Sequence, residues 1–263
     1  MRVRAGKHKL SRRQSLGYTA LTIMHVFANP ARFLKIARPL TAWLGWAGAV
    51  MIAGALAAGL FLAPPERLQG ESVRILYVHV PAAWLAMAGW SGIAVASLMQ
   101  LVWRHPLAVV AARAISIPGA LFAAICLATG SLWGRPTWGT YWEWDGRMTS
   151  MLVLLFLYIA YVALADAEQD KGGEGRITAI FGLVGAVNLP IIHYSVIWWN
   201  TLHQGESISF VRGTSTIDRS MLWPLLVSAL GFTLLFGAIV LMRMRADLAR
   251  NKVEARMRRM AAE

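Results

Sequence analysis

Two histidines are the residues in this sequence whose type and setting could bind a metal-bearing group. His79 lies in "YVHVPAAW" and His203 in "WWNTLHQG", far apart along the chain. A neutral imidazole nitrogen is a common ligand of iron, and two imidazoles on opposite faces of a flat ring complete a six-coordinate haem. From residue types alone, such a ligand pair is one option, and two unrelated surface histidines are the other.

A tryptophan-rich segment, "WGRPTWGTYWEWDGRMTS", lies between these histidines in the chain. Its tryptophans offer broad apolar faces that could stack on a flat ligand, and its arginines could pair with the carboxylates of that ligand. The acidic residues could orient the arginines or accept from indole N–H groups. The alternative is the aromatic belt that anchors many membrane proteins at the bilayer interface. The candidate binding residues are Trp133, Trp138, Trp142, Trp144, Arg135, Asp145 and Arg147, with Glu143 beside them.

The composition predicts that a membrane protein positions these residues. The chain has 263 residues, of which 57% are hydrophobic and 15% charged, and its mean hydropathy is +0.51. A helix needs about 20 apolar residues to cross a bilayer. Spanning segments must satisfy every backbone polar group internally, and the runs show no period-two alternation, so we expect helices. The predicted fold is all-α, a bundle of six transmembrane helices at 43–62, 78–103, 108–132, 148–165, 177–198 and 222–242.

The distribution of charge predicts the orientation of this bundle. The net charge is +13, and residues 1–38 hold nine Lys/Arg and no acidic residue, while 243–259 hold seven more Lys/Arg. Six spans place both termini on one side, and the positive-inside rule makes that side cytoplasmic. The basic ends then serve as anchors against anionic lipid, and nucleic acid is not an expected partner. The loops that carry the two histidines and the tryptophans face outward.

We therefore expect three regions along the chain. These are a basic cytoplasmic or interfacial segment at 1–42, a membrane domain at 43–243 with the tryptophan-rich loop at 133–147, and a basic cytoplasmic tail at 244–263. The sequence holds no phosphate-binding lysine loop, no dinucleotide fingerprint and only one cysteine, so it carries no autonomous catalytic motif of these kinds.

Pro81 and Pro190 are two of the prolines within the predicted spans, which also contain one further histidine. We expect Pro81 to open the second span, and Asn188 with Pro190 to interrupt the fifth. His193 follows this interruption. A polar side chain within a span is a functional candidate, but hydrogen bonding to a freed backbone carbonyl explains it equally well.

At these residues the chain resembles a known family of haem-handling proteins. "WGTYWEWDGRMTS" is similar to the tryptophan-rich WWD signature, in the form W-G-x-x-W-x-W-D-x-R. The flanks "HVPAAW" and "NLPIIHYSVIWWNTLHQG" resemble the CcmC (HelC) branch, the haem exporter protein C of bacterial cytochrome c maturation. The resemblance covers roughly residues 70–245.

This resemblance implies a function in cytochrome c biogenesis. Proteins of this kind hold haem b transiently at the periplasmic face of the bacterial inner membrane. The matched histidines, His79 and His203, would be the axial ligands of the iron, and the WWD loop would be a platform for the ring. The haem is then delivered to the haem chaperone CcmE, in a complex with the ABC transporter subunits CcmA and CcmB and the small protein CcmD. On this reading the chain is a haem-binding and transfer subunit and not an enzyme.

Three alternative functions stay open on the sequence. A transmembrane b-type cytochrome would carry electrons, but that class usually places histidine pairs deep within its spans. A transport pore with an aromatic gate predicts a polar stripe through the bundle. A scaffold subunit would bind only protein partners and would purify without haem.

Overall fold

A computed structural model describes residues 29–199, 201–203, 207–209 and 213–261 of the chain. Within these residues, six helical segments are long and apolar enough to cross a membrane, which confirms the predicted all-α six-helix fold. Most of the predicted N-terminal segment lies outside the described residues. The elements are α2 (Pro30–Phe61), the short 3-10 helix η1 (Glu71–Ile75), α3 (Leu76–Trp103), α4 (Ala108–Trp138), α5 (Gly146–Asp170), α6 (Arg176–Gly185), α7 (Asn188–Trp198) and α8 (Arg219–Met260).

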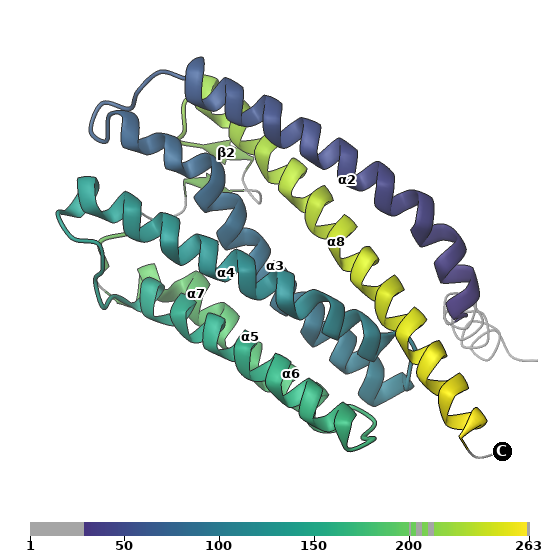
Figure 1. The fold of residues 1–263 in the computed structure, drawn as a ribbon. Helices are drawn as coiled ribbons and strands as arrows, with labels where there is room; N and C mark the ends of the chain where they lie inside the picture. Colours follow the sequence, from purple (N-terminus) through teal and green to yellow (C-terminus); the bar gives the residue numbers. More distant parts are fainter. Residues whose placement is uncertain (1–28, 200, 204–206, 210–212, 262–263) are drawn as a thin grey trace, which may run out of the picture.

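The helices form two groups that meet along α8. In Figure 1, α2 runs beside α8 on one side of the molecule, and α3 to α7 make up the other side. Gly48 of α2 allows the close contact between α2 and α8, because a Cβ there would lie 2.8 Å from the Gly231 carbonyl oxygen of α8. Such small residues let membrane helices approach closely. The start of α2 and the end of α8 lie at the same end of the bundle (Figure 1), as an even number of spans requires.

The core of the larger group is built on aromatic residues with satisfied polar atoms. Trp90 of α3 is fully buried and donates its indole N–H to the Gly182 carbonyl of α6 at 3.1 Å. Tyr158 of α5, equally buried, donates its hydroxyl to the Ala86 carbonyl of α3 at 2.7 Å. These bonds fix α5 and α6 against α3, which carries His79.

The first helix begins earlier than predicted, at Pro30 and not at residue 43. The side chain of Asn29 accepts from the backbone N–H groups of Ala31 and Arg32, and proline is well suited to the first helical position. Asn29 and Pro30 therefore start a 32-residue helix. Residues 30–42 belong to the same helix as the predicted first span.

The break in the fifth span is confirmed in position. The helix stops at Gly185 and restarts at Asn188, so Pro190 falls in the first turn of α7, where no N–H is needed. The Asn188 side-chain amide donates to the Ser150 carbonyl of α5 at 2.9 Å. The discontinuity thus packs against protein at the N-terminal half of α5.

For two of the other helical prolines, Pro81 and Pro118, side chains from α8 satisfy the carbonyls that the prolines leave free. Pro81 does not open the second span, because α3 begins at Leu76 and continues from η1. A helical proline leaves the carbonyl four residues earlier without its partner. For Pro81 this is the Tyr77 carbonyl, which accepts from the Ser228 hydroxyl at 2.6 Å. For Pro118 it is the Ala114 carbonyl, which accepts from Arg243 Nε at 3.1 Å.

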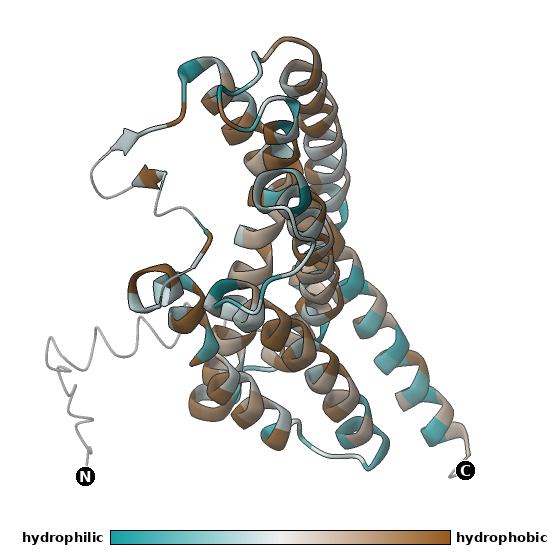
Figure 2. Cartoon of the chain, turned by 90° about the vertical axis from the view of Figure 1, so that its left-hand side faces the viewer, coloured by the Kyte–Doolittle hydropathy of each residue, from teal (hydrophilic) through white to brown (hydrophobic). Residues whose placement is uncertain are grey.

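The last helix extends well beyond a bilayer. Its 42 residues give a length of about 63 Å, twice the ~30 Å of the hydrocarbon core. Figure 2 shows hydrophilic residues recurring along its C-terminal part, which projects past the other helices. The tail predicted at 244–263 is thus helical over its described residues. Two antiparallel strands of two residues each, β1 (Ile208–Ser209) and β2 (Thr214–Ser215), lie in the connection between α7 and α8.

The tryptophan-rich segment is less of a loop than predicted. α4 continues to Trp138 and α5 begins at Gly146, so the connection itself is only 139–145. Gly139, with φ of +82°, ends α4 in the left-handed region, which glycine tolerates without strain. Trp133 and Trp138 are therefore held on the last turns of a helix, a firmer support than a loop gives.

Candidate functional site at one end of the bundle

His79 is held against the end of α4 through one ring nitrogen. Its Nδ1 lies 3.0 Å from the Cys126 carbonyl oxygen and 3.1 Å from Thr129 Oγ1. A carbonyl oxygen can only accept, so Nδ1 carries the proton and Nε2 keeps the lone pair. Gly130 makes room for the ring, because a Cβ there would lie 2.9 Å from His79 Cε1. The ring is thus fixed in place and in tautomer, with Nε2 left as the nitrogen able to bind a metal.

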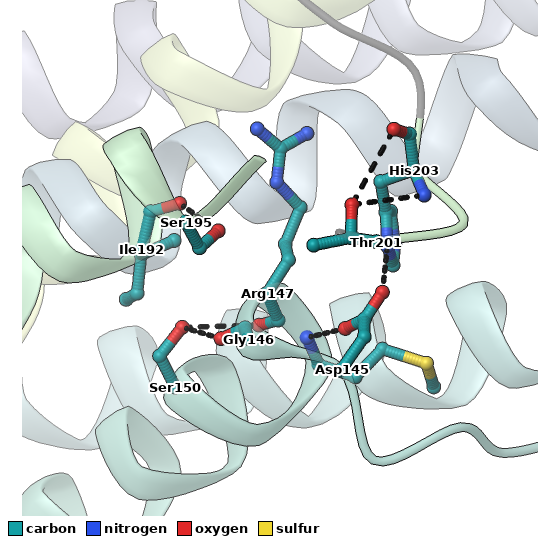
Figure 3. Close-up of polar contacts among 9 residues, drawn as sticks. Asp145, Gly146, Arg147, Ser150, Ile192, Ser195, Thr201 and His203 are labelled. Carbon is teal, nitrogen blue, oxygen red and sulfur yellow. Dashed lines mark hydrogen bonds and ion pairs between the residues drawn. The ribbon is translucent and has the colours of Figure 1, made fainter. Parts of the chain in front are cut away.

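His203 is held in the same way, by a carboxylate. Its Nδ1 donates to Asp145 Oδ2 at 2.6 Å, while Asp145 Oδ1 accepts from the Met148 backbone N–H at 2.7 Å (Figure 3). The backbone N–H of His203 also donates to Thr201 Oγ1 at 3.2 Å. Burial lowers the pKa of His203 below its usual value, and Asp145 opposes that shift. The neutral imidazole, the form that binds iron, is therefore favoured at neutral pH.

The helical tryptophans of the segment contact both histidines. Trp133 lies edge-on to His79 with ring centroids 5.5 Å apart, and its indole N–H donates to Gln69 Oε1 at 2.8 Å. Trp138 lies edge-on to His203 at 4.7 Å. The structure therefore joins the two predicted ligands to one element, the last turns of α4.

The loop tryptophans differ in their surroundings. Trp142 and Trp144 pack edge-on with centroids 5.3 Å apart. The indole Nε1 of Trp142 is buried and has no hydrogen-bond partner among the described residues, whereas Trp144 is 73% exposed. A buried donor without a partner is costly and is common where a ligand supplies the acceptor. Trp142 is thus a candidate donor to a ligand, and Trp144 lies on the outside of the cluster.

The two arginines of the segment also differ in their surroundings. Arg135 bonds the Gly139 carbonyl and lies over the Tyr141 ring at 5.6 Å, so its guanidinium is engaged at the end of α4. The Arg147 side chain extends from the first turn of α5, and its guanidinium has no hydrogen-bond partner among the described residues (Figure 3). Its positive charge contributes to the lowered pKa of His203. Arg147 is therefore the arginine placed to meet an anionic group.

Three supporting residues were missed by reasoning from the sequence. Thr129 and Gly130 hold and accommodate His79, as described above. Gly146 lets the segment before His203 approach α5, because a Cβ there would lie 2.8 Å from Trp199 Cε3. In the sequence, these positions are marked only by small and polar residues at the end of an apolar span. Such a pattern does not indicate which distant side chain packs against these residues.

His193, left open on the sequence, lies on the exposed side of α7, against Tyr194. The buried side of α7 carries Ile192 and Ser195. His193 therefore does not join the two site histidines.

Two cavities of the described chain lie at the opposite end of the bundle. Volumes of about 160 and 280 Å³ open between α4, α5 and α8 beside Arg113 and Arg250. Carboxylates already pair with these guanidinium groups, Asp166 at 2.7 Å and Asp247 at 3.0 Å. Their distance along the helices from His79 separates them from the histidine site.

Fold and site together define a class: a multi-pass membrane protein of six helices, with two imidazoles and a tryptophan cluster gathered at one end. No group of three or more His, Cys, Asp or Glu side chains able to hold a bare metal ion occurs in the described chain. The two histidines suit a metal whose other ligands come from a flat organic ring.

The chain belongs to the CcmC family, described as heme exporter protein C, whose profile matches residues 23–259. The heme exporter protein C of Bradyrhizobium diazoefficiens is 49% identical over 231 residues, covering 87% of this chain and 86% of the relative. That of Escherichia coli K12 is 46% identical over 222 residues, covering 84% and 89%. That of Paracoccus denitrificans is 37% identical over 234 residues, covering 89% and 96%. The chain is therefore a membrane protein of haem transport and cytochrome c biogenesis.

Proposed function

We propose that this chain binds haem b transiently at the periplasmic face of the bacterial inner membrane, with His79 and His203 as the axial ligands. The observation that carries the proposal is that both imidazoles are bonded through Nδ1, which leaves Nε2 of each to bind iron. Metal-binding histidines commonly show this arrangement. Haem would bring the flat ring that the tryptophans suit, and the iron that the imidazoles suit.

The remaining residues fit the other parts of a haem. Trp133 and Trp138 would line the ring beside the two ligands. The unpartnered Nε1 of Trp142 and the guanidinium of Arg147 would meet the propionates. Arg135 is engaged within its own loop, so we assign it to the structure of the WWD segment.

From this site the haem would pass to the periplasmic chaperone CcmE. The chain would act as a haem-binding and transfer subunit, not as an enzyme, in a complex with CcmA, CcmB and CcmD. The names of the relatives support the general role in haem export. The outward orientation follows from the basic residues of the two ends, which favour the cytoplasm.

The decisive experiment is the absorption spectrum of the purified protein. Wild type should co-purify with low-spin haem, and the His79→Ala/His203→Ala double variant should lose it. His193→Ala is the matched control, because this histidine lies on the exposed side of α7. An unchanged low-spin spectrum in the double variant would show that the ligand assignment is wrong.

Delivery needs a separate measurement. Trp138→Ala and Trp142→Ala together should reduce haem loading of CcmE more than they reduce membrane insertion of the chain. Rapid haem reduction by quinol, with haem that never leaves the protein, would instead support the transmembrane b-type cytochrome.

A further inference from the structure

The Nδ1 atoms of the two site histidines make hydrogen bonds of different strength. Nδ1 of His203 meets a carboxylate oxygen at 2.6 Å, whereas Nδ1 of His79 meets a carbonyl and a hydroxyl at 3.0 and 3.1 Å. Hydrogen bonds to an ionised acceptor are shorter and about twice as strong as those between neutral groups. A carboxylate on the far nitrogen also raises the basicity of an imidazole toward a metal. The two imidazoles are therefore unequal as ligands.

Both carboxylate oxygens of Asp145 are bonded to protein groups. One oxygen caps α5 at the Met148 N–H and the other accepts from His203, and the side chain is only 4% exposed. The buried carboxylate thus faces protein groups on both oxygens. Its direct link to the proposed ligand is the bond to His203, so we expect Asp145 to act on a bound group through this histidine.

We propose that Asp145 is a positioning residue, which fixes Nε2 of His203 as the iron-binding nitrogen and makes His203 the stronger axial ligand. His79, with neutral partners, is then the axial position open to exchange when haem is handed on. Because Asp145 also caps α5, the start of that helix and the orientation of His203 are set by one side chain. This inference rests on the proposed function, and it assigns unequal roles to the two histidines.

The first test needs no haem. Asp145→Asn keeps the size of the side chain, but an amide that caps α5 with its oxygen turns its NH₂ toward His203. That donor favours an imidazole with its lone pair on Nδ1 and its proton on Nε2. Nitrogen NMR of histidine-labelled, haem-free protein reports the tautomer, and the His203 signal is identified by its loss in His203→Ala.

We expect the Nδ1–H tautomer in wild type and the Nε2–H tautomer in Asp145→Asn. The matched control is Asp218→Asn, because Asp218 caps α8 at the Ser220 N–H at 2.8 Å without the histidine contact. Asp145→Ser is a second variant, which retains a capping side chain and removes the carboxylate. A wild-type Nε2–H tautomer, or no change in either Asp145 variant, overturns the inference whether or not the chain binds haem.

The second test measures haem retention. Loss of such a partner weakens metal binding by about 10–100-fold, so Asp145→Asn should release haem faster by that factor, and Asp218→Asn should not. His203→Ala should release haem faster than His79→Ala, and the two should become equal in the Asp145→Asn background. Equal release in the wild-type background overturns the unequal roles. Failure of wild type to bind haem would instead reject the proposed function and leave the tautomer result standing.

Discussion

Gly130→Ala should weaken haem binding through the position of His79 alone. An added Cβ would lie 2.9 Å from His79 Cε1, while ordinary contact begins near 3.4 Å, so the ring must move by about 0.5 Å. Helix α4, which carries Gly130, cannot yield easily, because its residue Cys126, one turn earlier, is buried in the core. The movement stretches the bond from Nδ1 to the Cys126 carbonyl, now 3.0 Å, to the limit of hydrogen bonding.

The expected loss of haem affinity follows from the role of the hydrogen bond between His79 Nδ1 and the Cys126 carbonyl. A lost partner on a ligand imidazole costs about 10–100-fold in metal affinity, which is about 1.4–2.7 kcal/mol. The assay is titration of the purified, haem-free protein with haem, followed by absorption. Gly54→Ala is the control, because Gly54 has open space around its Cβ position and alanine favours a helix by about 0.5–1 kcal/mol.

Unchanged haem affinity in Gly130→Ala, with His79→Ala still defective, would refute this reasoning. It would mean that the ring tolerates the shift and that its contact with α4 does not set its binding. Equal losses in Gly130→Ala and Gly54→Ala would point to a general effect of the substitution on folding.

Three further outcomes follow from the packing. Ser228→Ala should lower thermal stability in detergent by about 1 kcal/mol, since it strips a buried carbonyl of its donor, and adding Pro81→Ala should restore most of the loss by returning an N–H. Gly48→Leu should separate α2 from α8 and lower the melting temperature, because its Cβ position already touches backbone atoms at 2.8 Å; a stable variant would contradict that contact. Arg147→Ala should reduce haem retention less than loss of either histidine, and Arg135→Ala should leave it unchanged; a reversed order would reject their assignment.

The limits of sequence reasoning are clear at the helix ends. Residues 1–42 were assigned to a basic segment before the first span, but Asn29-Pro30 starts the helix of that span, because the asparagine side chain caps the next N–H groups. The tryptophan segment was assigned wholly to a loop, although α4 extends into it as far as Trp138. Apolar content marks the membrane core and says little about how far a helix extends beyond it.

The sequence by itself determined the number of helices, because long apolar runs must hydrogen-bond internally in lipid and six such runs are present. It also singled out the histidines and the tryptophan segment, whose spacing resembles a known family. Only the tertiary structure decided how these residues work together. Asp145 was expected near arginines or indoles, yet folding brings it to His203, 58 positions away. Hydrogen bonds between distant segments depend on how the helices pack, and that geometry fixes which nitrogen of each imidazole is left to bind a ligand.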